Sequence, residues 1–183
     1  GRVAALSETS RTPLERRLAR ILEINAELLG EFDVEVLTVR VIQYALEMLN
    51  AERGFVILRQ PDDTLTVHSS RDQRGDVVRA EFSRSIAERV LVTQKPVVSL
   101  NARNDSRMQG YASVHQLMLQ AVACVPINAR RGEPLGALYL ETRLKPGGDF
   151  ERELPTLSAF ADQVGLAIDT ARLVSENQRR ANE

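Results

Sequence analysis

Cysteine is almost absent from this 183-residue chain, in which Cys124 is the only one. A single thiol cannot close an intrachain disulfide, and redox catalysis by thiol exchange needs a second thiol. Such low cysteine usage predicts a cytoplasmic protein. Histidine is nearly as scarce, and His68 and His115 lie 47 positions apart. Because metal sites draw on clustered His, Cys and carboxylate groups, we expect no metal site.

Other absences exclude further classes of function. There is no tryptophan, and a net charge of −1 offers no basic surface, so we expect no direct nucleic-acid binding and no membrane binding. No apolar run approaches the ~20 residues that span a bilayer, and the start, GRVAALSETSRTP, lacks the apolar core of a signal peptide. Neither a G-x-S-x-G nucleophile motif nor a G-x-x-x-x-G-K-[ST] phosphate loop is present. We therefore expect a protein that is not an enzyme and carries no cofactor.

The residues that are present indicate a soluble globular domain. Hydrophobic residues make up 43% of the chain and charged residues 27%, which allows a substantial core. Residues 1–12 are small and polar and predict a flexible leader, and residues 13–180 predict a single domain. The first residue is Gly rather than Met, so we expect the chain to be a piece of a longer protein.

Helical periodicity recurs near both ends and once in the middle. Leu14, Leu18, Ile21 and Leu28 form a stripe that Gly30 ends, and Asp33 is a candidate N-cap for the next helix. In the middle, Ser85 and Glu88 fit a capping box. The expected helices span about residues 13–29, 34–49, 85–93 and 153–179, and a further helix is expected between the polar loop that begins at residue 101 and the strand at 121.

Strand-like segments occupy most of the remainder. FVILRQ and TLTVHSS flank a turn at Pro61 and predict a hairpin, and a second hairpin is expected across Arg131 and Gly132. The six expected strands cover residues 55–60, 64–70, 77–82, 96–100, 121–130 and 133–142. Consecutive hairpins favour an antiparallel sheet with the terminal helices on one face, which is the α+β class.

Three segments resemble the GAF domain family of bacterial signalling proteins. NAERGFVIL at 50–58 resembles the helix-to-strand entry of such domains, and CVPINARRGEPLGALYLE at 124–141 resembles their paired late strands. FERELPTLSAFADQVGLAIDTARL at 150–173 resembles their closing helix. The resemblance covers roughly residues 17–175. It is greatest to the GAF modules of sigma-54-dependent transcription activators, histidine kinases and nucleotide cyclases.

This resemblance implies a GAF-like fold with a roughly six-stranded antiparallel sheet between helices. A small-molecule pocket would lie on the sheet face away from the terminal helices. The helix at 85–93 and the segment 101–117 would roof that pocket. GAF modules commonly dimerise through their end helices, so the resemblance also implies a homodimer with a downstream effector domain in the same chain, such as a transcription activator, a kinase or a cyclase.

The polar segment 101–117, NARNDSRMQGYASVHQL, supplies the candidate ligand-binding residues. Arginine can hold a phosphate or carboxylate with two hydrogen bonds, and Asn and Asp can bind the edge of a base or an amine. Long loops in compact domains tend to be functional or mobile. The candidates are Asn101, Arg103, Asp105, Arg107, Tyr111 and His115.

Alternative interpretations of the same residues remain open. The segment could be a solvated loop whose charges pair locally. Asn101 is followed by Ala and Asp105 is not followed by Glu, which departs from the pattern of GAF modules that bind cyclic nucleotides. His115 can be a haem ligand or a solvated side chain. Cys124 can be an inert core residue or a bilin attachment site, and its apolar neighbours favour the core.

The apolar stripes of the terminal helices predict a dimer interface, because extended helices must bury such stripes somewhere. The alternative is that each stripe packs on its own sheet. The expected interface residues are Leu14, Leu18, Ile21, Leu28, Leu157, Val164, Ile168 and Ala171. Two hypotheses of function follow: a sensory module that binds a small molecule and relays the signal through its terminal helices, or a ligand-free module for dimerisation and relay.

Overall fold

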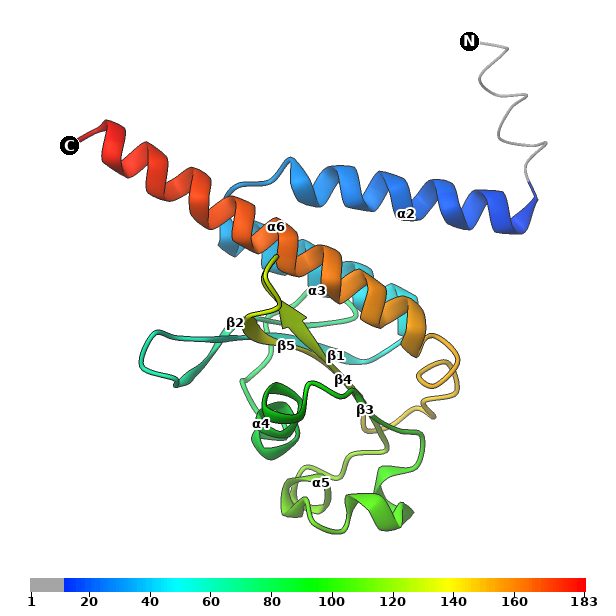
Figure 1. Ribbon diagram of the computed structural model, residues 1–183. Helices are drawn as coiled ribbons and strands as arrows, with labels where there is room; N and C mark the ends of the chain where they lie inside the picture. The colour runs from blue at the N-terminus through cyan, green and yellow to red at the C-terminus, as the bar shows by residue number, and fades with distance from the viewer. Residues whose placement is uncertain (1–11) are drawn as a thin grey trace.

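The computed structural model describes residues 12–183, so of the expected leader over residues 1–12 only Thr12 falls within the described residues. The described chain has three layers, with an antiparallel sheet in the middle, long helices on one face and short helices on the other (Figure 1). The α+β class with the terminal helices on one face is therefore confirmed. The long helices are α2 (Pro13–Leu29), α3 (Val34–Leu49) and α6 (Leu154–Ala181).

The sheet contains five strands in the order β2-β1-β5-β4-β3, and every neighbouring pair is antiparallel. Its central strands β1 and β5 are apolar at consecutive positions because helices cover both of their faces. The strands are β1 (Arg53–Arg59), β2 (Leu65–Asp72), β3 (Val97–Ser99), β4 (Ala121–Asn128) and β5 (Pro134–Thr142).

The sixth expected strand, over residues 77–82, does not form. Only Val77 makes a bridge to the edge strand β2, opposite Arg71. The Ser70 hydroxyl donates a hydrogen bond of 2.7 Å to the Val78 carbonyl oxygen. The segment then turns away because Phe82 inserts its ring beneath α4 (Arg84–Thr93), where the ring is buried. Burying one aromatic ring thus outweighs continuing the ladder.

Local capping signals fix the starts of α2 and α3 but not the start of α4. The Asp33 carboxylate accepts hydrogen bonds from the N–H groups of Glu35 and Val36, as expected for the N-cap of α3. The capping box expected at Ser85 is wrong, because α4 begins at Arg84 with Ser83 at its N-cap. The buried Ser83 N–H donates to the Tyr139 hydroxyl at 3.2 Å, and this tertiary contact sets where the helix begins.

Five of the residues expected at a dimer interface lie instead in the core of this chain. They belong to the apolar core that the long helices form with the sheet, with less than 2% of their surface exposed, so a second chain cannot reach them. The sheet needs an apolar cover on this face, and α6 supplies it with the stripe that the periodicity revealed. The five residues are Leu28, Leu157, Val164, Ile168 and Ala171. Leu14 and Leu18 remain exposed, and Ile21 is half-buried.

A buried polar contact joins the edge strand β2 to α3. The Thr38 hydroxyl on α3 lies 2.7 Å from the Ser69 hydroxyl on β2, and both side chains are buried. A hydroxyl buried without a partner would cost about 1–3 kcal/mol. The pair therefore fixes the position of β2 relative to α3.

Candidate functional site

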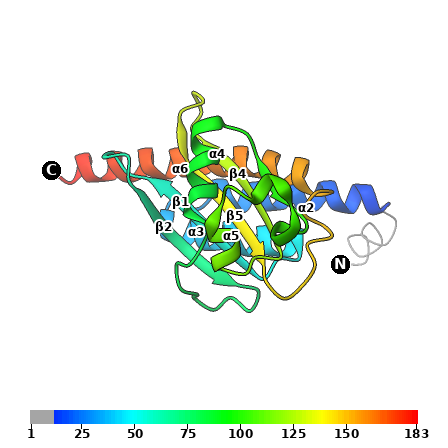
Figure 2. The same cartoon turned by 90° about the horizontal axis from the view of Figure 1, so that it is seen from below.

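The roofed face is the side of the sheet covered by α4, by α5 (Ala112–Gln116) and by two short 3-10 turns, Ala102–Asn104 and Ser106–Met108 (Figure 2). Three aromatic rings lie at its centre. Phe55, Phe82 and Tyr139 contact one another with ring centroids 5.5–5.7 Å apart. This triangle of rings fills the space in which the resemblance places a ligand.

Aliphatic side chains from each element of the roof complete the packing. Ile86 and Val90 come from α4, Val114 comes from α5, and Met108 comes from the 3-10 turns. All of these side chains are buried together with Cys124 of β4. Interiors packed in this way leave no room for a ligand without rearrangement.

The polar groups of the roofed face are bonded to one another. The Ser83 hydroxyl lies 2.5 Å from the Ser113 hydroxyl, which joins the start of α4 to α5. Burial, and next the nearby Glu141 carboxylate, raise the pKa of the Tyr139 phenol well above its usual value. Tyr139 therefore stays protonated, and its hydroxyl accepts the hydrogen bond from the Ser83 N–H.

Asp105 connects the segment 101–117 to β3. Its carboxylate accepts hydrogen bonds from the Ser99 hydroxyl at 2.7 Å and from the Arg107 guanidinium at 2.7 Å and 3.1 Å. The Arg107 side chain, and next the Ser99 hydroxyl, hold the pKa of the Asp105 carboxyl well below its usual range. Two of the predicted ligand-binding groups thus bind each other.

The other predicted residues of this segment point in different directions. The Arg103 guanidinium donates to the carbonyl oxygens of Met118 at 2.7 Å and Arg143 at 3.3 Å. Tyr111 is half-buried against the roofed face, whereas His115 is exposed on α5. Asn101 shares a shallow depression of about 290 Å³ with Asp105 and Arg107.

The structure therefore splits the predicted set. It gathers Asn101, Asp105 and Arg107 and separates them from Arg103, Tyr111 and His115. The local pairing of Asp105 with Arg107 favours the solvated-loop interpretation of this segment. Ligand binding by these residues stays a prediction.

A group of charged side chains at the end of β5, which we call the charged junction, was not predicted. Glu141 is buried on β5 and lies 2.8 Å from the Arg143 guanidinium. Burial raises the pKa of the Glu141 carboxyl above its usual value, although Arg143 opposes this change. A glutamate at the end of the apolar run LGALYLE was the available signal, because a buried carboxylate needs a partner nearby.

The same junction is anchored by Glu52, which precedes β1. Its carboxylate accepts hydrogen bonds from the N–H groups of Arg143, Leu144 and Lys145 at 2.6–3.3 Å. Burial raises the pKa of the Glu52 carboxyl, but these three N–H groups and the Lys145 charge outweigh burial, so the pKa lies below its usual value. These hydrogen bonds fix the loop after β5, so we interpret the junction as structural.

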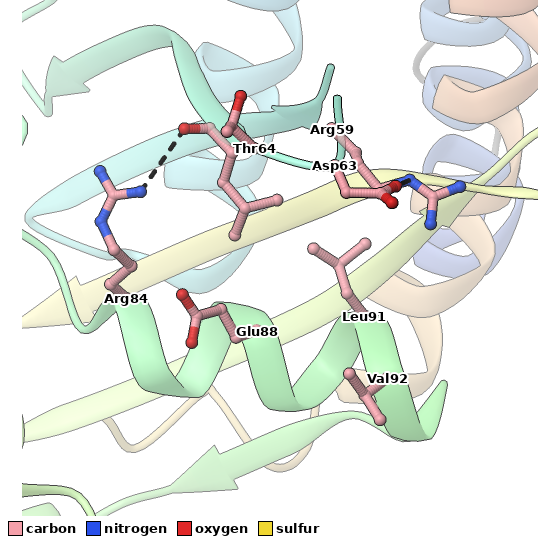
Figure 3. A pocket seen from close by; sticks show the side chains of 8 residues that line it. Arg59, Asp63, Thr64, Arg84, Glu88, Leu91 and Val92 are labelled. Atoms are coloured by element: carbon pink, nitrogen blue, oxygen red, sulfur yellow. Dashed lines mark hydrogen bonds and ion pairs between the residues drawn. The ribbon is translucent and has the colours of Figure 1, made fainter. Parts of the chain in front are cut away.

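A cleft lies beside α4, lined by residues that were not among the predicted ligand-binding residues. This cleft, which we call the α4 cleft, has a volume of about 630 Å³ and separates α4 from the turn between β1 and β2 (Figure 3). The helix contributes Arg84, Glu88, Leu91 and Val92. The opposite wall consists of Arg59, Asp63, Thr64 and Leu65. Its size falls in the range of small-molecule sites, about 300–1,000 Å³.

Residues 32–169, well over half of the chain, match the protein family described as GAF domain. The chain belongs to this family. The sensory and signalling character of GAF domains is the coarse statement of function that follows. No curated protein matches the chain.

Solved structures, among them one of a GAF domain, share the fold at low sequence identity. The GAF domain of the nlh2 protein of A. aeolicus, in an inactive state, is 21% identical with a TM-score of 0.59, covering 81% of this chain and 92% of that one. A methyl-accepting chemotaxis protein, residues 122 to 287, is 16% identical with a TM-score of 0.62, covering 82% and 98%. Free methionine-R-sulfoxide reductase from Neisseria meningitidis, in complex with its substrate, is 14% identical with a TM-score of 0.64, covering 82% and 87%.

Reactive groups are few in the described part of this GAF domain. Burial raises the pKa of the Cys124 thiol well above its usual value, which keeps the sulfur protonated and unreactive. Within residues 12–183 no three His, Cys, Asp or Glu side chains lie close enough to hold a metal ion. No helix among these residues is both long and apolar enough to span a bilayer.

Proposed function

We propose that this GAF domain is a non-catalytic regulatory module of a cytoplasmic signalling protein, and that it pairs with a second copy through α2 and α6. It would pass signals along these helices to an effector domain in the same longer chain. The expected effectors are a sigma-54-dependent transcription activator, a histidine kinase or a cyclase. A chemotaxis protein and a two-component sensor histidine kinase are among the proteins with similar folds, which supports a signalling role.

The observation that carries the proposal is the uncovered apolar surface of α2. Leu18 and Leu22 are 52% and 69% exposed, and Leu14 continues their row toward the start of the helix. Beside this row, Ile21 of α2 and Ala159 of α6 line an apolar groove of about 190 Å³ between the two helices. Exposed apolar rows of this kind mark interaction surfaces.

The exposed face of α6 extends this surface. Ala159, Leu166 and Leu173 recur at seven-residue spacing on the side turned away from the sheet, and Leu173 is exposed. The Arg17 guanidinium on α2 binds the Glu153 carboxylate next to α6 at 2.5 Å, so the two helices start at the same end. Two adjacent helices with apolar outer faces suit a four-helix contact between two copies.

We expect the double change Leu18→Asp with Leu22→Asp to convert a dimer into a monomer, with the dissociation constant raised at least about 30-fold, because burying each leucine side chain is worth about 1.5–3 kcal/mol. Native mass spectrometry at micromolar concentrations measures this effect. The matched control is Val92→Asp, since Val92 is also a strongly exposed apolar side chain, at 82%, on another helix. A wild-type chain that stays monomeric, or a control that dissociates equally, would contradict the proposal.

A second candidate function, small-molecule sensing, is favoured by the α4 cleft rather than by the roofed face. The roofed face is filled by the chain's own side chains, whereas the α4 cleft is open and of ligand size. A ligand there would touch both α4 and β2. Saturable changes in the NMR signals of the Thr64 and Leu65 amides on addition of a metabolite would test this candidate.

A further inference from the structure

The α4 cleft carries two opposite charges one helical turn apart. Arg84 and Glu88 both come from α4, and Figure 3 shows their charged groups rising from the helix toward the opposite wall. Residues four apart on a helix are neighbours and commonly pair. Yet no ion pair or hydrogen bond joins these two side chains in the described structure, and Glu88 has no other partner there.

Arg84 is held in place by contacts that leave most of its donors free. Its guanidinium makes one long hydrogen bond of 3.4 Å to the Leu65 carbonyl and lies 5.4 Å from the centre of the Phe82 ring. A guanidinium has five N–H donors in a planar fork. A carboxylate can therefore still bind Arg84 through two hydrogen bonds.

The wall between the charges and the far end of the cleft is apolar. Leu65 and Leu91 are half-buried there, and Val92 is exposed. At the far end Arg59 and Asp63 form a loose ion pair of 3.8 Å with each other. Charges of both signs therefore line the cleft in equal number, with an apolar surface between them.

This charge balance selects among ligand classes. A phosphate or nucleotide would gain from Arg84 but would be repelled by Glu88 and Asp63. A purely cationic ligand would meet the opposite difficulty at the two arginines. A ligand with adjacent positive and negative groups and an apolar tail satisfies all the surfaces at once.

We propose that the α4 cleft binds a free α-amino acid with an apolar side chain. Arg84 receives the carboxylate, Glu88 receives the ammonium group, and the side chain lies against Leu65, Leu91 and Val92. The proposal rests on the small-molecule role proposed above and names its ligand class. It does not depend on dimerisation.

The test is an NMR titration of the purified chain with L-leucine up to about 10 mM, the weak range expected for an open site. We expect saturable changes at the amides of Thr64, Leu65 and Glu88. Three analogues each remove one feature: 3-methylbutylamine lacks the carboxylate, 4-methylpentanoate lacks the ammonium group, and glycine lacks the apolar tail. Each analogue should bind at least about tenfold more weakly than L-leucine, because each leaves Arg84, Glu88 or the apolar surface of the cleft without its partner.

Single substitutions test the contributions of Arg84 and Glu88 separately. Glu88→Gln should weaken L-leucine about tenfold and abolish its advantage over 4-methylpentanoate, since the group that favours the ammonium is gone. Arg84→Gln should likewise abolish the advantage over 3-methylbutylamine. The matched control is Arg89→Gln, an exposed charge on the same helix that does not line the cleft, and it should leave binding unchanged.

The possible results distinguish a failure of the amino-acid proposal from a failure of the more general small-molecule role. No saturable change with L-leucine, or equal binding of 4-methylpentanoate, overturns the amino-acid proposal. If adenosine monophosphate or inorganic phosphate instead gives saturable changes at the same amides, the amino-acid proposal is wrong and the small-molecule role stands. If none of these compounds binds, both fall.

Discussion

Gly165→Ala is expected to lower the free energy of unfolding by about 3 kcal/mol or more, or to prevent folding. A Cβ atom at this position of α6 would lie 1.8 Å from the Asn128 carbonyl oxygen of β4. The neighbour is backbone, so no side chain can rotate away. Helix propensity alone would favour Ala by about 1 kcal/mol, which makes the sign of the effect informative. Urea unfolding followed by circular dichroism measures it.

Gly148→Ala provides the matched control for this change. A Cβ atom at Gly148 would meet no atom within 4 Å, so its effect should stay within about 0.5 kcal/mol. If Gly165→Ala were as stable as the wild type, α6 could not lie against the end of β4 as closely as described. The placement of the closing helix on the sheet would then be wrong.

Phe55→Ala is expected to destabilise the protein by about 3–5 kcal/mol. Phe55 is fully buried, and its ring contacts Phe82 at 5.5 Å and Tyr139 at 5.6 Å between centroids. Removing the ring would leave a cavity at the centre of the roofed face. Denaturant unfolding measures the loss, and the same variant tests whether this face is filled.

Phe32→Ala is the corresponding control, because Phe32 is exposed in the loop between α2 and α3. Its effect should stay within about 1 kcal/mol. A loss below about 1.5 kcal/mol for Phe55→Ala would show that the roofed face is loosely packed or already hollow. A ligand site beneath α4 would then become the better interpretation.

Elements with strong local signals could be predicted from the sequence. The end of α2 before Gly30, the Asp33 cap of α3 and the hairpin around Pro61 all depend on neighbouring residues, and all three are present. The segments expected as strands at 55–60 and 133–142 are present as β1 and β5. In each case the signal and the structure that it specifies lie within a few residues of each other.

The errors arise where distant contacts decide. The 77–82 segment has strand-like composition, but the burial of Phe82 draws it away from the sheet edge. The stripe of α6 that includes Leu157 was correctly identified as apolar and wrongly assigned to a partner chain. Periodicity shows that a face is buried and does not show what covers it.

The candidate site was the least predictable part of the molecule. Polar composition drew attention to Asp105 and Arg107, which satisfy each other. The α4 cleft brings Arg59 and Asp63 of the first hairpin to a helix that starts at Arg84. Because that proximity comes from the topology alone, no spacing along the chain could reveal it.

The hydrogen bond between the Thr38 and Ser69 hydroxyls couples the edge strand β2 to α3. Leu65 begins the same strand and forms part of the wall of the α4 cleft. A displacement of Leu65 that moved β2 would therefore move α3 as well or break this buried hydrogen bond. Since α3 packs against α6 in the same apolar core, a ligand bound in the α4 cleft, as proposed, would be linked to the helices on the opposite face of the sheet through β2 and α3.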